Sequence, residues 1–358
     1  IPNDNRIVFF KNELSKWQYD ELNNITTKGP SSTKIVDGFS INSIQASNII
    51  YPSGVFEDGK EIGVIGAKSI STAFEIENHK YTYKPYAQKS NKGKSFLHID
   101  NIGKYSKKIE NILKSILTSK GIVFVYSNYG THGIKPLALA LEENGFNRYI
   151  GKEKVNNFLD KTIPDNNKYC AVNKMYKREL KKTPEKLKSF RQAKYIYLDG
   201  FTKKNDLSDL VREIRGEGMS KDGTILKNNF GEHILVILGS KVIEQGVSLH
   251  NIREIHIMDP WWHLNMLEQA AGRGFRNYSH FDLEKKYRNL TLYLHIATLP
   301  IGNKTGIETN DEKMYRIAYY KKQQMSIVER QLKMNAVDCS LNKYGNMFLS
   351  SNYSKYDE

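Results

Sequence analysis

The chain has 358 residues, a formal net charge of +15 and a sequence pI near 9.4. This length is sufficient for two domains, or for one large domain with added segments, around a substantial apolar core. The excess of positive charge favours a polyanionic partner, with nucleic acid ahead of an anionic membrane. A general bias toward Lys, Asn, Ile and Tyr is the alternative explanation of the charge.

The cysteines and the apolar runs exclude several classes of protein. Only Cys170 and Cys339 are present, and they lie far apart, so neither a disulfide framework nor a zinc site is expected. No apolar run reaches the length that spans a membrane. We therefore expect an intracellular protein with no membrane partner. Because the chain starts at Ile1 without a methionine, we also expect it to be a fragment of a longer protein.

The first 104 residues carry the weakest pattern. Residues 7–10 fit a strand and residues 14–24 fit a helix. Between residues 80 and 94, three tyrosines are interspersed with lysines. Aromatic rings stack on bases and lysines follow phosphates, so this stretch is a candidate strand-binding segment. A solvated, flexible linker is the alternative.

Residues 105–300 alternate between helical and strand patterns. Helices are expected at 105–119, 134–144 and 206–214, and strands at 122–126, 195–198, 234–238, 254–258 and 290–297. This alternation predicts an α/β fold with a parallel sheet. The lysine-rich segment 151–193 has no strand period, so we expect a helical insertion. From residue 310 a further helix is expected, running to about residue 337, with an apolar stripe that packs against the rest of the protein.

Polar residues follow several of the predicted strands. Ser127 and Asn128 come after strand 122–126, and Ser240 and Lys241 come after strand 234–238. The carboxyl ends of parallel strands meet at one edge of a sheet, where doubly wound folds bind their ligands. Ser127 and Asn128 are therefore candidate contacts to a nucleic-acid backbone. An ordinary helix-capping turn explains the same two residues equally well.

Three long polar side chains follow strand 254–258. Gln269, Arg273 and Arg276 stand at positions i, i+4 and i+7, a spacing that predicts one shared helix face. A guanidinium keeps its charge and binds phosphate oxygens in a fork, so this face suits a phosphate ligand. A solvated helix face with surface ion pairs is the alternative.

Three motifs around these residues resemble a known family. GSKVIEQG, residues 239–246, resembles motif V of superfamily 2 helicases and translocases, and QAAGRGFR, residues 269–276, resembles their motif VI. DPWW, residues 259–262, resembles the version in Swi/Snf-type remodellers and in helicase-like proteins of large DNA viruses. NAVDCSLNKYGN, from Asn335, resembles the tail of poxvirus-type helicase-like proteins. In these motifs the chain resembles poxvirus early transcription factor small subunits and their giant-virus relatives.

The resemblance implies a fold class and a division of the chain. The fold is expected to be a RecA-like parallel sheet with flanking helices, the second lobe of a helicase, with a helical insertion and a C-terminal helical extension. Residues 1–104 would be an N-terminal or inter-lobe segment of uncertain fold. Residues 105–305 would be the RecA-like domain, with the insertion at about 151–193, and residues 306–358 would be the extension.

The resemblance also implies roles for the arginine motif. The protein would be the C-terminal half of an ATP-dependent nucleic-acid helicase or translocase. Arg276 would be the arginine finger that reaches the γ-phosphate of ATP held by the other lobe. Arg273 would lie beside it on the phosphates, and Gln269 would help to place the phosphates or the attacking water.

The motif V resemblance implies contacts on both sides of the nucleotide cleft. Gly246 and Ser248 would contribute to the nucleotide site, while Ser240 and Lys241, together with Ser127 and Asn128, would contact nucleic acid. Two departures from the family pattern weaken ribose contact. Ser248 stands where many members have aspartate, and Gln245 stands where an arginine usually precedes the glycine.

The half that grips ATP and Mg²⁺ is absent from the sequence. Gly93-Lys94-Ser95 lacks the earlier glycine of a phosphate loop, because Gln88 occupies that position. The acidic pair Asp311-Glu312 begins a helix instead of ending a strand. We therefore expect ATP and Mg²⁺ to be held mainly by an N-terminal RecA-like lobe of the same protein, and this chain alone to be inactive.

The remaining implied partners are DNA or RNA, and a viral RNA polymerase or transcription factors, in a cytoplasmic viral factory or in the virion. A non-catalytic module for nucleic-acid binding or transcription assembly is the alternative function. A small-molecule enzyme on a doubly wound sheet is less favoured, because no glycine-rich fingerprint follows any predicted strand.

Overall fold

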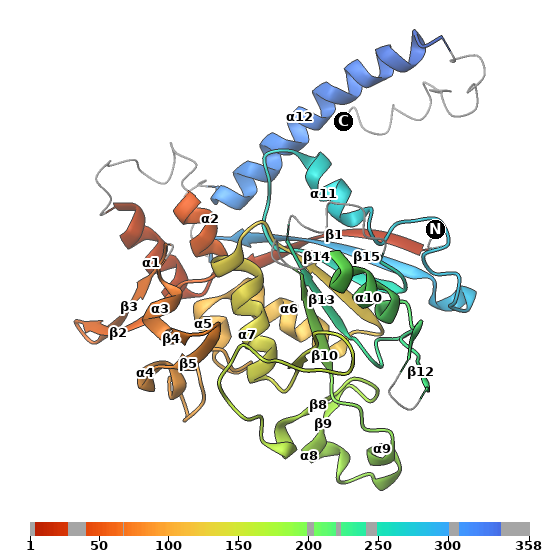
Figure 1. Ribbon diagram of the computed structural model, residues 1–358. Coiled ribbons are helices and arrows are strands. Elements are labelled where there is room, and N and C mark those ends of the chain that lie inside the picture. Colours follow the sequence, from red (N-terminus) through yellow and green to blue (C-terminus); the bar gives the residue numbers. More distant parts are fainter. Residues whose placement is uncertain are drawn as a thin grey trace.

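A seven-stranded sheet forms the centre of the protein (Figure 1). The computed structural model describes residues 4–27, 41–66, 68–198, 204–219, 223–240, 249–300 and 308–337. In spatial order the strands are β1 (Asp4–Glu13), β15 (Asn289–Thr298), β14 (Ile252–Ile257), β6 (Ile122–Tyr126), β13 (Val236–Gly239), β10 (Lys194–Leu198) and β7 (Asn147–Arg148). Every neighbouring pair is parallel. The predicted α/β class and parallel sheet are therefore confirmed.

Helices cover both faces of this sheet. They are α6 (Lys107–Thr118) and α7 (Lys135–Glu143) on one face, and α10 (Lys204–Ile214) and α11 (Leu264–Ala271) on the other. Within β6, Val123 and Val125 join the core with α6 and α7, whereas Ile122 and Phe124 join the core on the opposite face. Successive strand residues point to opposite faces, so a strand that is buried on both sides needs this continuous apolar run.

The N-terminal residues belong to the same core. Strand β1 pairs with β15 over ten residues, and Tyr51, Phe74 and Phe96 pack with the core that includes α6 and α7. The connecting elements are α1 (Lys16–Thr27), α2 (Ile41–Asn48), β2 (Tyr51–Glu57), β3 (Lys60–Val64), α3 (Ile70–Ala73), β4 (Phe74–Glu77), β5 (Lys80–Tyr83), α4 (Pro85–Gln88) and α5 (Ile102–Tyr105).

The tyrosines of residues 80–94 are core residues. Tyr83 is buried, and Tyr81 and Tyr86 pack partly buried against the core. The segment is thus a folded hairpin and short helix. It is neither a flexible linker nor a row of exposed stacking rings.

The segment 151–193 is mostly irregular, so the expectation of a helical insertion was wrong. Its regular elements are short: a 3₁₀ turn (Asp165–Asn167), β8 (Tyr169–Cys170), β9 (Met175–Tyr176), α8 (Lys177–Leu180) and α9 (Pro184–Lys188). Buried Glu142 of α7 anchors the segment by accepting hydrogen bonds from the amides of Phe158 and Leu159, at 2.8 and 2.6 Å. The sequence has no apolar repeat at helical spacing here, so tertiary anchors hold the segment.

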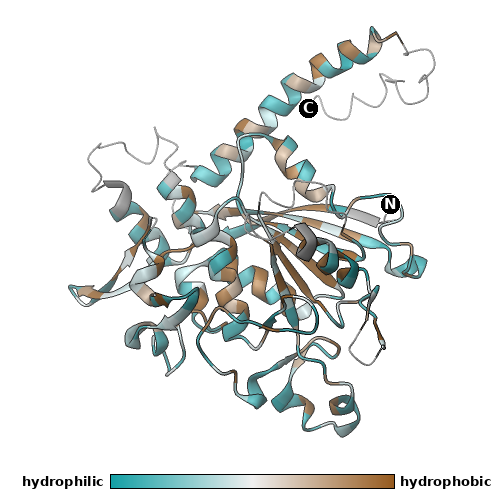
Figure 2. Cartoon of the chain, in the orientation of Figure 1, coloured by the Kyte–Doolittle hydropathy of each residue, from teal (hydrophilic) through white to brown (hydrophobic). Residues whose placement is uncertain are grey.

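The last described helix, α12 (Asn310–Met334), projects from the body (Figure 1). Thr309 and Glu312 form a capping box at its start. Met314, Tyr315 and Ala318 are buried, whereas Met325, Val328 and Leu332 are exposed. Figure 2 shows hydrophobic colouring along the projecting part of α12. Within the described residues, the apolar stripe packs only over the first turns of the helix.

The remaining short elements connect the larger ones. They are a π-helical turn (Gly130–Ile134), β11 (Gly218–Met219), β12 (Ile225–Leu226) and a 3₁₀ turn (Lys285–Tyr287). No helix in the described part of the chain is long and apolar enough to cross a membrane.

Candidate nucleotide and nucleic-acid site

Three of the predicted strand ends meet at one edge of the sheet. β14, β6 and β13 are neighbours, and their carboxyl ends are tied by backbone hydrogen bonds. The Ser127 amide donates to the Gly239 carbonyl at 3.2 Å, and the Met258 amide donates to the Tyr126 carbonyl at 2.9 Å. The expectation that these ends share one edge is confirmed.

A buried carboxylate organises this edge. Asp259, directly after β14, is fully buried and accepts hydrogen bonds from the Ser127 hydroxyl, the Asn128 amide and the Asn128 side chain, the last two at 3.0 Å each. Asn48 of α2 donates a further bond at 3.3 Å. Burial raises the pKa of the Asp259 carboxyl, and the bonds from Ser127 and Asn128 oppose that shift.

The two predicted backbone contacts after β6 differ in accessibility. Ser127 is fully buried, and its oxygen also accepts a bond from the Tyr129 amide at 3.1 Å. Its hydroxyl therefore holds the turn and Asp259, which does not support a direct contact with a nucleic-acid backbone. Asn128 and Ser240 are partly exposed at the same edge. Lys241 lies outside the described residues.

A buried lysine extends the same network. The Lys108 ammonium donates to the Asn48 side-chain oxygen at 2.9 Å and pairs with Asp311 at 2.5 Å. Neither Lys108 nor the role of Asp259 was predicted from the sequence. The available signal was the position of Lys108, four residues before Ile112 on the buried face of α6. A lysine on an apolar stripe needs a buried partner.

The arginine motif does not lie on one helix face, so that expectation was wrong. Helix α11 ends at Ala271, which leaves Gln269 exposed on the helix and places Arg273 and Arg276 in the turns that follow. The Arg273 and Gly274 amides bond to carbonyls three residues earlier, at 3.3 and 3.0 Å. These shorter repeats take the chain out of the α-helix.

A glycine lies just after the point where the chain leaves the helix. A Cβ atom on Gly274 would lie 3.0 Å from the Ile255 side chain of β14. A side chain at this position would therefore make a tight contact with the sheet, which glycine avoids.

The arginine turn, residues 272–276, contacts the chain shortly after the stretch that resembles motif V. The Leu249 amide donates to the Arg273 carbonyl at 3.1 Å, and the Asn251 amide donates to the Ser279 carbonyl at 2.9 Å. Gly246 and Ser248 lie outside the described residues. The structure thus brings the arginine turn beside Leu249, three residues after Gly246 in the sequence.

The two arginines have different surroundings. Arg273 is 9% exposed, whereas Arg276 is partly exposed and donates from Nε to the Gly272 carbonyl at 3.4 Å. The positive charge of Arg276 is one of the charges that act on the His250 ring. Burial first, and then the positive charge of Arg215, lowers the pKa of the His250 ring. A positively charged turn beside a neutral histidine can attract phosphate oxygens.

The described residues contain no group of three or more His, Cys, Asp or Glu side chains that could hold a metal ion. The arginine turn offers donors for the phosphate end of a nucleotide, whereas magnesium needs oxygen ligands. A seven-stranded parallel sheet with helices on both faces defines the class of the fold as RecA-like α/β.

Comparison with known proteins agrees with that class. Residues 154–278 match the family model described as "Helicase conserved C-terminal domain". The chain is 28% identical over 352 residues to a putative ATP-dependent RNA helicase, R563, of Acanthamoeba polyphaga mimivirus, which covers 96% of this chain and 48% of that protein. It is 26% identical over 255 residues to the termination factor NPH-I homolog of African swine fever virus, covering 66% of this chain and 33% of that protein.

Residues 154–278 therefore match a helicase C-terminal domain, and most of the chain is similar to helicase-like proteins of large DNA viruses, the group that its motifs resemble. The chain spans about half the length of the mimivirus relative and less of the others. Among solved structures it is similar to the C-terminal part of the Fun30 ATPase domain, with 16% identity, 88% coverage of each chain and a TM-score of 0.40. Because this TM-score is low, the fold is assigned from the observed seven-stranded sheet and not from this similarity.

Proposed function

We propose that the chain is the C-terminal half of an ATP-dependent helicase or translocase, in which Arg276 acts as an arginine finger. The observation that carries the proposal is the hydrogen bond from the Leu249 amide to the Arg273 carbonyl at 3.1 Å. It ties the arginine turn to Leu249, three residues after the motif V-like stretch. This contact supports a role for both motifs at one nucleotide-facing surface.

Phosphoryl transfer explains why this surface needs arginine. The transferred group carries charge on its equatorial oxygens, and a guanidinium supplied from outside the ATP-gripping lobe stabilises that charge. Arg276 is the more exposed of the two arginines and is assigned to the γ-phosphate. Arg273, held in the turn, supports it, and exposed Gln269 helps to orient the phosphates or water. Bound ATP with Mg²⁺ supplies the reacting phosphate and its charge neutralisation, and another lobe grips them.

Nucleic acid is the proposed track. The net charge of +15 favours a polyanion, and Asn128 and Ser240 are partly exposed at the strand-end edge where Lys241 follows. Relatives are named putative ATP-dependent RNA helicases, and one carries the name of a termination factor homolog. We extend the proposal to DNA or RNA binding in viral transcription, with a viral polymerase or transcription factor as partner, in a viral factory or virion.

The test is ATP turnover by the full-length protein carrying Arg276→Ala. Turnover should fall about 10³-fold or more if Arg276 is the finger, and Arg276→Lys should recover little because a lysine lacks the planar fork. Arg316→Ala is the matched control. Arg316 is an exposed arginine on α12, and its guanidinium is paired with the carboxylate of Glu308. Turnover within a few-fold of wild type in Arg276→Ala would remove this residue from the reaction.

A further inference from the structure

Two exposed aromatic rings lie just beyond the arginine turn. Tyr278 is 76% exposed and Phe281 is 64% exposed. Their ring centroids lie 6.2 Å apart and their planes meet at 67°. The rings form an open corner, named here the aromatic corner. Such a corner offers the face of one ring and the edge of the other to a flat ligand.

The loop that carries the aromatic corner is held rigidly. Arg288 donates from Nε to the Leu283 carbonyl at 2.7 Å and from its terminal nitrogen to the Phe281 carbonyl at 2.8 Å. The buried His280 ring bonds to the Ile252 carbonyl at 2.6 Å and to the Ser279 hydroxyl at 2.8 Å. Burial lowers the pKa of His280, so its ring is neutral near pH 7. The loop is thus fixed to the start of β14.

The backbone of Tyr278 is in an uncommon conformation. Its φ is +62°, in the left-handed region that bulky side chains rarely adopt. The exposed ring gains little from core burial, so packing does not explain why a tyrosine stands there. A strained backbone on a rigid loop that presents an exposed ring indicates a functional position.

A recess of about 410 Å³ adjoins the aromatic corner. It is lined by Asn277, Tyr278, His280, Phe281 and Arg288. The Arg288 guanidinium lies 5.6 Å from the Phe281 ring centroid. Lys285 and Lys286 lie outside the lining on the same loop, and Lys286 is paired with Glu284 at 2.9 Å. The recess therefore combines stacking surfaces, an amide and positive charge. Two rings offer too little apolar area for a stable protein interface, whereas a planar, anionic ligand of small size fits the chemistry.

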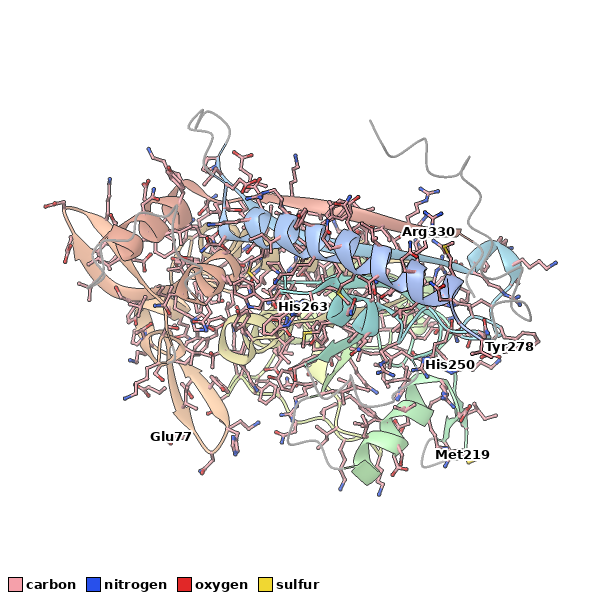
Figure 3. All side chains as sticks on the ribbon, turned by 90° about the horizontal axis from the view of Figure 1, so that it is seen from above. Glu77, Met219, His250, His263, Tyr278 and Arg330 are labelled. Atoms are coloured by element: carbon pink, nitrogen blue, oxygen red, sulfur yellow. The ribbon has the colours of Figure 1, made fainter. Side chains whose placement is uncertain are left out.

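We propose that the aromatic corner binds the base of a nucleotide unit, with its phosphate directed to the cations of this loop. The base can come from a nucleic-acid strand or from a free nucleotide. The site adjoins the arginine turn, because the Ser279 amide donates to the Arg276 carbonyl at 3.2 Å. Figure 3 shows Tyr278 and His250 on the same side of the molecule. This binding site goes beyond the proposed function, since it needs no role for Arg276 in hydrolysis.

The experiment compares binding of labelled oligothymidylate, its abasic counterpart, AMP and ATP to the full chain and its variants. Tyr278→Ala and Phe281→Ala should each weaken oligothymidylate binding by about tenfold, the range of one lost stacking contact. Abasic-strand affinity should be unchanged, and Tyr278→Phe should bind like wild type. Tyr320→Ala removes a ring that is 62% exposed on α12 and is the matched control.

The comparison of oligothymidylate with AMP and ATP distinguishes the two sources of the base. A loss confined to the oligothymidylate identifies a strand site, and a loss confined to AMP and ATP identifies a free-nucleotide site. Unchanged affinity for all ligands in both alanine variants would overturn the proposal, as would an equal loss on the abasic strand. ATP turnover by the Arg276→Ala variant is measured separately from ligand binding by the ring variants. Failure of this binding proposal and failure of the proposed function can therefore be told apart.

Discussion

The Lys108 ammonium lies 2.5 Å from the Asp311 carboxylate, and both side chains are fully buried. This ion pair joins α6, which precedes the strand-end edge, to the first turn of α12. Through Asn48, Lys108 also reaches Asp259, the carboxylate that holds the turn after β6. The base of the C-terminal helix and the candidate nucleic-acid edge thus share one buried polar network.

Breaking this ion pair should destabilise the fold strongly. Lys108→Met leaves Asp311 buried without its counter-charge and should lower the free energy of unfolding by about 3–5 kcal/mol. In the native protein the Ala297 backbone amide donates to the Asp311 carboxylate at 2.9 Å. Adding Asp311→Asn should restore part of the lost stability, because the side-chain oxygen of asparagine can still accept this hydrogen bond. Urea unfolding of the single and double variants measures the coupling.

The exposed pair between Arg316 and Glu308 is the control for that series. Arg316→Met should lower the free energy of unfolding much less than Lys108→Met, because solvent screens an exposed pair. Equal losses at the buried and exposed pairs would contradict the importance of the network.

Stability should fall as pH rises across the titration of Glu142. Burial raises the pKa of this carboxyl to about 7, against hydrogen bonds from Leu159, Tyr195 and Phe158. Between its ordinary value of 4.5 and about 7, the folded state keeps a proton that the unfolded state has released, so rising pH favours unfolding. This group should contribute roughly 3 kcal/mol across that window.

Glu142→Gln isolates this contribution. The variant cannot titrate, so its free energy of unfolding should change less between pH 4.5 and 7 than that of wild type. The measurement is urea unfolding at several pH values for both proteins. Parallel pH profiles would show that Glu142 titrates at its ordinary value in the folded protein.

Nucleic-acid binding should be sensitive to salt and nearly independent of sequence. The net charge of +15 motivates this prediction, because neutralised phosphates release counterions. Affinity should fall at least about tenfold when salt rises from roughly 50 to 200 mM. Titration of labelled single- and double-stranded oligonucleotides measures the slope. A flat response would mean that electrostatic attraction does not drive binding.

The chain alone should fold without hydrolysing ATP. Its sheet carries helices on both faces and buries its own core, which favours independent folding. Turnover needs a phosphate loop and magnesium carboxylates, and Gln88 occupies the glycine position of the one loop-like sequence. The measurement is steady-state turnover with saturating nucleic acid, for this chain and the full-length protein. Turnover by the purified chain alone would reveal a second, unrecognised active site.

Local pattern was sufficient for the motifs and for every strand of the sheet except the short edge strand β7. Continuous apolar runs such as residues 122–126 are typical of strands buried on both faces, and the structure has β6 at that range. The helix patterns gave α7, α10 and α12 to within a few residues. The positions of Gln269, Arg273 and Arg276 were visible for the same reason: motif spacing is a property of neighbouring residues.

Tertiary packing decided what those residues face. The spacing predicted a helix through Arg273 and Arg276, but α11 ends at Ala271, and the turn that follows packs Gly274 against Ile255 of β14. Likewise, Tyr83 is buried and Tyr278 is exposed, although both follow polar sequence. Burial depends on elements that meet only after folding, so the composition around each ring could not distinguish them.

The sequence by itself determined the class of protein, because strand runs, motif spacing and charge are local properties of the chain. Only the tertiary structure decided that Ser127 supports Asp259, that Lys108 pairs with Asp311, and that the arginine turn meets Leu249. Each of these contacts joins residues from different elements of the chain. Their geometry depends on how the helices pack on the sheet, and no local pattern records that packing.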